Sequence, residues 1–142
     1  MSLYSQQSKL AAYRSVDAHG TVASADPHAL VLCLFDAVLG RLMAARSCIE
    51  QGEIARKASL LHSSITLIGE LRGSINLHQG GSLAQNLSDL YEYMVRRLLH
   101  ANVSNDKGAV SEVLGLLGEI REAWAAIGPE VRGQGPRSAA IG

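Results

Sequence analysis

Apolar residues recur every three or four positions along most of the chain, which is the period of an amphipathic helix. The pattern predicts four helices, over residues 26–52, 53–76, 82–102 and 106–127. Residues that favour helix starts stand at Asp26–Pro27, Ser82 and Asp106. Residues that end helices stand at Gly52, Gly80–Gly81 and Gly128–Pro129.

Short links between long helices place sequence neighbours side by side and antiparallel. The expected fold is therefore all-α: an antiparallel up-down four-helix bundle over residues 26–127. Residues 1–25 are weakly apolar and are expected to form an N-terminal cap segment. Residues 128–142 are rich in Gly and Pro and predict a disordered tail.

The apolar surface of these helices is wider than one bundle core requires. On the second helix the predicted core line is Ile54, Ala58, Leu61, Ile65, Ile68 and Ile75, a line that also includes Arg72. A second line, about 100° away, holds Leu60, Leu67 and Leu71. Leu30 and Leu34 on the first helix, and Leu114 on the fourth, also stand off their predicted core lines. Either the N-terminal segment or a broad core covers these residues, or they form a groove for an amphipathic partner helix, with that segment as a removable cover.

Charge and composition argue against several classes of partner. Thirteen basic and thirteen acidic residues give a formal net charge of zero, so no basic field favours nucleic acid or anionic lipid. No uninterrupted run of about 18 apolar residues predicts a membrane span, and no secretory signal is expected, which favours a cytoplasmic protein. Cys33 and Cys48 fall about 22 Å apart on one predicted helix, too far for a disulfide, and are expected to be reduced.

The sequence carries no pattern typical of catalysis, of a metal site or of a cofactor site, so the chain is not expected to be an enzyme. His62 is the one histidine in the middle of a predicted helix, and it leaves a histidine phosphotransfer domain as an alternative function. No lysine lies nearby to hold a phosphoryl group. A generic helical adaptor or regulator is the other alternative.

Several segments together resemble the flagellin export chaperone family, FliS, over roughly residues 4–127. They are AAYRSV, which contains Tyr13, and LVLCLFDAVL, QNLSDLYEYMVRRLLHAN, NDKGAV and EAW. The resemblance implies a cofactor-free helical bundle that binds the disordered C-terminal region of flagellin, prevents premature polymerisation and assists delivery to the type III export gate. It also implies that a tyrosine-bearing N-terminal segment covers part of the binding surface. Tyr13 matches that tyrosine by its local context, and Tyr4 matches it less closely, because the spacing near the N-terminus varies.

The residue pattern and the resemblance together give a set of candidate partner contacts. They are Tyr4, Leu10, Tyr13, Leu30, Leu34, Leu60, Leu67, Leu71 and Leu114. A segment that folds on binding needs apolar contact on the order of 1,000–3,000 Å², which these residues would help to supply. The hypothesis predicts that a charge at Leu67 or Leu71 weakens flagellin binding more than it lowers stability. Weak self-association through the same leucines is a further option.

Overall fold

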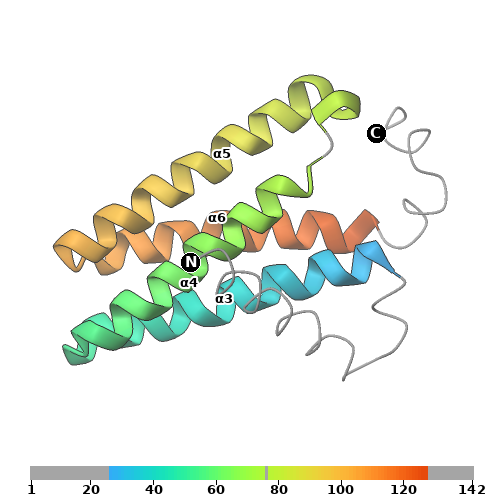
Figure 1. Cartoon of the computed structure of the whole chain (residues 1–142). Helices are drawn as coiled ribbons and strands as arrows, with labels where there is room; N and C mark the ends of the chain where they lie inside the picture. Colours follow the sequence, from blue (N-terminus) through green and yellow to red (C-terminus); the bar gives the residue numbers. More distant parts are fainter. Residues whose placement is uncertain (1–25, 76, 128–142) are drawn as a thin grey trace, which may run out of the picture. The chain divides into compact units, whose positions relative to one another are not determined.

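The structure, a computed structural model, describes residues 26–75 and 77–127, and these ranges contain helices and no strand (Figure 1). The helices are α3 (Pro27–Gln51), α4 (Ile54–Gly73), α5 (Leu77–Ser104) and α6 (Lys107–Ile127). The predicted all-α class is confirmed. The predicted cap segment, with Tyr4, Leu10 and Tyr13, and the predicted tail lie outside the described residues.

Two predicted caps hold the starts of α3 and α6. The Oδ1 atom of Asp26 accepts hydrogen bonds from the backbone N–H groups of His28, at 3.1 Å, and Ala29, at 3.4 Å. The Oδ1 atom of Asp106 accepts one from the backbone N–H of Ala109 at 3.2 Å. Each carboxylate satisfies amide groups that have no partner within the helix, so both helices start where the sequence predicts.

Residues in the left-handed backbone conformation end α3 and α5. Gly52 has φ +74°, and the chain closes a Schellman turn there, with the N–H of Glu53 donating to the carbonyl of Cys48 at 2.9 Å. Asn105 has φ +52° and ends α5, two residues later than the sequence predicts. Glycine and asparagine both tolerate a positive φ, so the chain can make a tight turn at each of these residues.

A break lies near the start of α5, as the glycine pair predicts. Gly81 has φ 59° and ψ −138°, so the backbone leaves the helical conformation at that residue. Helical residues nevertheless flank Gly81 on both sides, and the helix as a whole begins at Leu77. The preceding helix, α4, ends at Gly73, three residues before its predicted end.

Residues 35–122 form one compact unit; of a second unit, the structure describes residues 26–34 and 123–127. Within the first unit, polar pairs join α3 to α6: Asp36 with Arg121 at 2.9 Å, Arg46 with Ser111 at 3.1 Å, and Glu50 with Lys107 at 2.9 Å. Each step forward along α3 is matched by an equal step back along α6. The two helices are therefore antiparallel and in register.

Polar bonds also cross the other three helix pairs of this unit. They are Arg41–Ser63 between α3 and α4, Lys57–Asn102 and Arg72–Ser88 between α4 and α5, and Tyr93–Glu112 and Arg97–Glu112 between α5 and α6. Each helix thus has the neighbours that an up-down four-helix bundle requires, and the predicted architecture is confirmed.

The core of this unit consists of apolar side chains that recur with helical period on all four helices. Its largest fully buried members include Phe35, Val38, Leu42, Leu61, Ile68, Leu71, Met94, Leu98, Val110, Val113 and Leu117. Tyr91 is buried with them, and desolvation raises the pKa of its phenol to about 12. The helical period predicts the burial of Phe35, Val38 and Leu42 on α3, of Met94 and Leu98 on α5, and of Val110, Val113 and Leu117 on α6, whereas Ile127 follows the same period on α6 but is 40% exposed.

The predicted core line of α4 is confirmed at Leu61 and Ile68, which are buried, but not at Ile54, which is 50% exposed. The buried line includes Leu61, Ser64, Ile68 and Leu71, and Leu71 is only 1% exposed, whereas Arg72 is exposed. The physical reason is that Ser64 enters the core by donating its hydroxyl to the carbonyl of Leu60 at 2.8 Å, so a polar residue occupies a core position. The core line is therefore rotated toward Leu71.

By length and composition alone, α3 is apolar enough to cross a membrane, with a mean hydropathy of 1.7 over an 18-residue window. No uninterrupted apolar run predicts this property, because polar residues are scattered along α3 and only its average hydropathy is high. In the bundle, Asp36 and Arg46 on α3 bond to α6, Arg41 bonds to α4, and Phe35 is buried. These contacts make α3 a bundle helix.

Lys57 is the first test of the bundle. Its side chain is 2% exposed, and its Nζ atom donates to the carbonyl of Asn102 at 2.8 Å and to Oδ1 of Asn105 at 2.6 Å. We expect Lys57→Met to lower the free energy of unfolding by about 1–3 kcal/mol, because both acceptors lose their charged donor. Urea unfolding followed by circular dichroism measures this loss.

The matched control is Lys107→Met, because Lys107 pairs with Glu50 at 2.9 Å with both side chains about half exposed. An exposed pair contributes less than about 1 kcal/mol. Equal losses in the two variants would contradict the structural role of Lys57.

Acid should destabilise the bundle through carboxylates at its surface. Hydrogen bonds from Tyr93 and then Arg97 lower the pKa of Glu112 below its ordinary 4.5, and the N–H of Ala109 lowers the pKa of Asp106 below 3.8. A depressed pKa contributes stability that is complete above the ordinary value and is lost as pH falls through the folded value. The free energy of unfolding should therefore fall as pH drops below about 5. In urea titrations across this range, Glu112→Gln should show a shallower fall, and an identical slope would refute the assignment.

Candidate functional site

The predicted partner-binding leucines separate into two groups. Leu30, Leu60 and Leu114 are half-buried and keep some exposed surface. Leu34, Leu67 and Leu71 are buried, which agrees with the alternative that these leucines are covered rather than exposed in a groove. The structure therefore does not form an exposed leucine stripe along α4.

Large exposed apolar side chains occur at other positions. Within the described ranges they are Met43, Ile54, Leu83, Leu99, Val103 and Ile127. Ile54, Leu99 and Val103 are 50%, 53% and 84% exposed and belong to α4 and α5. The bond between Lys57 and Asn102 places all three at the same end of this helix pair.

Helical geometry extends this apolar surface along α4 and α5. Around α4, Ile54, Ile65 and Arg72 lie within about 20° of one another. Around α5, Val95 and Leu99 lie within about 20° of Ser88, which bonds to Arg72. The two columns therefore face each other, and Figure 1 shows α4 and α5 running alongside one another. We define the α4·α5 face as Ile54, Ile65, Val95, Leu99 and Val103.

Sequence reasoning missed this face, although a signal was present. The helical period assigns Leu98 to the core of α5, which leaves the adjacent Leu99 outside it. Val103 follows Leu99 by four residues and lies on nearly the same side. On α4, the predicted core line included Ile54, which the structure exposes.

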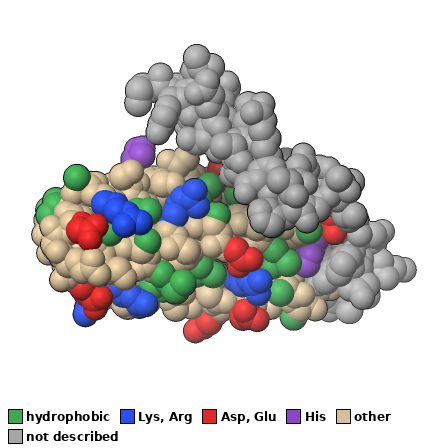
Figure 2. All heavy atoms as spheres, turned by 90° about the horizontal axis from the view of Figure 1, so that it is seen from below, with side chains coloured by type: hydrophobic (Ala, Val, Ile, Leu, Met, Phe, Trp, Pro, Cys, Tyr) green, Lys and Arg blue, Asp and Glu red, His purple; other side chains and the backbone are tan. Residues whose placement is uncertain are grey.

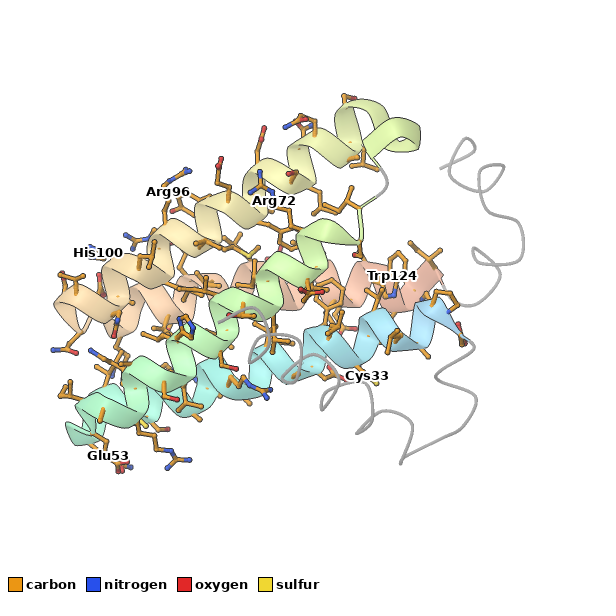
Figure 3. All side chains as sticks on the ribbon, in the orientation of Figure 1. Cys33, Glu53, Arg72, Arg96, His100 and Trp124 are labelled. Atoms are coloured by element: carbon orange, nitrogen blue, oxygen red, sulfur yellow. The ribbon has the colours of Figure 1, made fainter. Side chains whose placement is uncertain are left out.

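Arg72 lies at the opposite end of the α4·α5 face. Its Nε atom donates to the hydroxyl of Ser88 at 2.7 Å, and Ser88 is only 4% exposed. Figure 3 shows Arg72 on α4, on the side of α5. Arg72 is exposed, although the predicted core line of α4 includes it.

A polar network crosses from α5 to α6. Glu112 accepts hydrogen bonds from the hydroxyl of Tyr93 at 2.5 Å and from Nε of Arg97 at 2.7 Å. The bond to Glu112 raises the pKa of Tyr93. Arg96 pairs with Glu92 at 3.6 Å and lies 5.9 Å from the centroid of the Tyr93 ring. Both arginines thus have carboxylate partners, as expected for an ion-paired surface.

In the second unit, Trp124 stacks on His28 with ring centroids 4.9 Å apart. The indole Nε1 donates to the carbonyl of His28 at 3.0 Å, and Nε2 of His28 lies 2.8 Å from the carbonyl oxygen of Trp124. The sequence predicts that the indole N–H needs a partner, and the structure supplies one. Figure 3 shows Trp124 near the end of α6.

Two features of the described residues bear on chemistry. Cys48 is a buried free thiol, and its Sγ atom lies 4.0 Å from Oε1 of Glu53. No group of three or more His, Cys, Asp or Glu in the described part of the chain is placed to hold a metal ion. On the face shown in Figure 2, acidic and basic side chains are mixed, with hydrophobic side chains between them.

Comparison with known proteins assigns the chain to a family. Residues 9–131 match the family described as Flagellar protein FliS. The flagellar secretion chaperone FliS of Salmonella typhimurium is 43% identical over 131 residues, which cover 92% of this chain and 97% of that protein. FliSB of Pseudomonas aeruginosa is 41% identical over 81% of this chain and 91% of its own length, and FliS of Vibrio cholerae is 33% identical over 85% and 89%. The chain therefore belongs to the FliS family of flagellar secretion chaperones.

Proposed function

We propose that this protein is a cytoplasmic export chaperone that binds the C-terminal region of flagellin. It keeps that region from polymerising prematurely and assists delivery to the flagellar type III export apparatus. The observation that carries the proposal is the family match over residues 9–131, because it includes the whole of the described bundle. The α4·α5 face, of which Ile54, Leu99 and Val103 are exposed, supports it, since a chaperone works through contact area.

The physical requirement is that binding must offset the entropy a disordered segment loses when it folds. Extensive apolar contact provides that free energy. The α4·α5 face supplies one part of the contact, and the half-buried Leu30, Leu60 and Leu114 supply further parts. The α4·α5 face, Leu60 and Leu114 are the proposed client surface of residues 35–122, and Leu30, which belongs to the other unit, is a separate proposed contact.

The remaining predicted contacts require a rearrangement before they can reach a client. Leu34 and Leu67 are buried, so they become contacts only after the residues that bury them move. Tyr4, Leu10 and Tyr13 are proposed to belong to a cap that flagellin displaces. Leu71 is a core residue, and a charge there would lower bundle stability directly.

Co-purification tests the proposed function. The full chain, expressed with flagellin, should retain full-length flagellin and lose flagellin that lacks its C-terminal segment. Folded protein that binds neither form would exclude the proposal and favour a generic helical adaptor. Equal retention of both forms would place the bound segment elsewhere in flagellin.

A charge on the α4·α5 face should weaken client binding selectively. Leu99→Asp removes an apolar contact and adds a charge that must be desolvated, so we expect affinity for flagellin to fall at least about tenfold. Because Leu99 is exposed, the free energy of unfolding should change by no more than about 0.5 kcal/mol. Titration calorimetry and urea unfolding give the two quantities.

Leu83→Asp is the matched control. Leu83 is exposed on the same helix but lies outside the α4·α5 face. Its substitution should leave affinity within about twofold. If both aspartates weakened binding equally, the contact would not be localised to the α4·α5 face.

A further inference from the structure

Arg72 makes one hydrogen bond through Nε, and the other N–H groups of its guanidinium are available for further hydrogen bonds. The hydroxyl of Ser88 is buried and needs a partner, which Nε of Arg72 provides at 2.7 Å. That hydrogen bond uses one of the five N–H donors of the arginine and fixes the plane of the guanidinium group. The outer nitrogens therefore present a preoriented cation on an exposed residue.

The other arginines of the described bundle differ from Arg72. Their carboxylate pairs are Arg56–Glu53, Arg96–Glu92, Arg97–Glu112 and Arg121–Asp36. Arg41 and Arg46 also donate to serine hydroxyls, but both arginines are half-buried. Arg41 donates a second hydrogen bond, to the carbonyl of Ala37. The charge of Arg46 helps to lower the pKa of Glu50. Within the described residues, Arg72 is the exposed arginine with no carboxylate oxygen within 4.0 Å.

The location of this cation matters because it continues an apolar surface. Arg72 lies in the same column of α4 as Ile54 and Ile65, two to five turns further along the helix. Across the helix pair, Ser88 lies in the same column of α5 as Leu99. A helix packed along the α4·α5 face would meet apolar side chains first and then Arg72 at the end.

We propose that Arg72 is a client-recognition residue that binds an Asp or Glu side chain of the flagellin segment packed on the α4·α5 face. This inference rests on the proposed function. A carboxylate would form charge-assisted, bidentate hydrogen bonds with the outer nitrogens of the guanidinium. A lysine at the same place in a competing segment would be repelled, so the contact selects for sequence as well as for apolarity.

A purely structural role is the alternative. Arg72 lies in the last turn of α4, where the helix dipole favours a cation, and its bond satisfies Ser88. In that case its loss would change the free energy of unfolding and leave affinity for flagellin unaltered. The two roles are therefore separable by measuring both quantities.

The experiment is titration calorimetry of the full chain with full-length flagellin over a series of NaCl concentrations. Arg72→Gln should weaken binding about three- to tenfold at low salt and reduce its dependence on salt. Arg56→Gln is the matched control, because Arg56 is also an exposed arginine of α4 but pairs with Glu53 and lies about 160° around the helix from Arg72. The control should bind within about twofold of the parent.

A double-mutant cycle then identifies the bound carboxylate. Each Asp and Glu of the flagellin C-terminal segment is changed singly to Asn or Gln and titrated against the parent and Arg72→Gln. Substitution at one acidic position of flagellin should weaken binding to the parent chain and have little further effect on binding to Arg72→Gln. The proposal is overturned if no substitution of an acidic side chain couples to Arg72 in this way. It is also overturned if only amidation of the flagellin C-terminus shows the coupling.

Failure of this inference is distinguishable from failure of the proposed function. If the parent chain does not bind flagellin, the proposed function fails. If the parent binds and folded Arg72→Gln binds equally well with the same salt dependence, only the role of Arg72 fails. Should Arg72→Gln not fold, Arg72→Met keeps the aliphatic part of the side chain, and unchanged affinity in that variant would equally overturn the proposal.

Discussion

The arrangement of α4 and α5 depends on the buried ammonium group of Lys57. Its Nζ atom bonds to the carbonyl of Asn102 and the side chain of Asn105, at the point where α5 ends and turns toward α6. A buried charge without such partners is strongly destabilising, so few other alignments of α4 against α5 are available. The same bond brings Ile54 to the end of the pair that holds Leu99, and thereby assembles the apolar surface proposed to bind the client.

The class of fold and most helix ends could be predicted because their signals are local. Asp26 and Asp106 cap helices whose amides lie within three residues, and Gly52 adopts the conformation that its lack of a side chain permits. The core line of α4 could not be predicted as well. Ser64 and Lys57 are polar yet buried, and the partners of Lys57 lie 45 and 48 residues away. No periodicity of apolar residues contains that information.

The candidate site was harder to predict than the fold for the same reason. Exposure of Leu99 follows from its place beside the core residue Leu98, but exposed single leucines are common and do not define a surface. What distinguishes this surface is the approach of α4 to α5 and the bond from Arg72 to Ser88. Both are tertiary contacts. The proposed recognition of a client would thus depend on helix register, which places the apolar side chains and Arg72 at a fixed separation.

The stacked pair of Trp124 and His28 also has a practical consequence. Trp124 is the one tryptophan of the 142-residue sequence, and it lies in a different compact unit from residues 35–122. Intrinsic emission on excitation of the indole therefore reports on the paired ends of α3 and α6, whereas far-ultraviolet ellipticity is dominated by the longer helices. Coincident transitions in the two signals would mark an all-or-none molecule, and separated ones would reveal a part that loosens first.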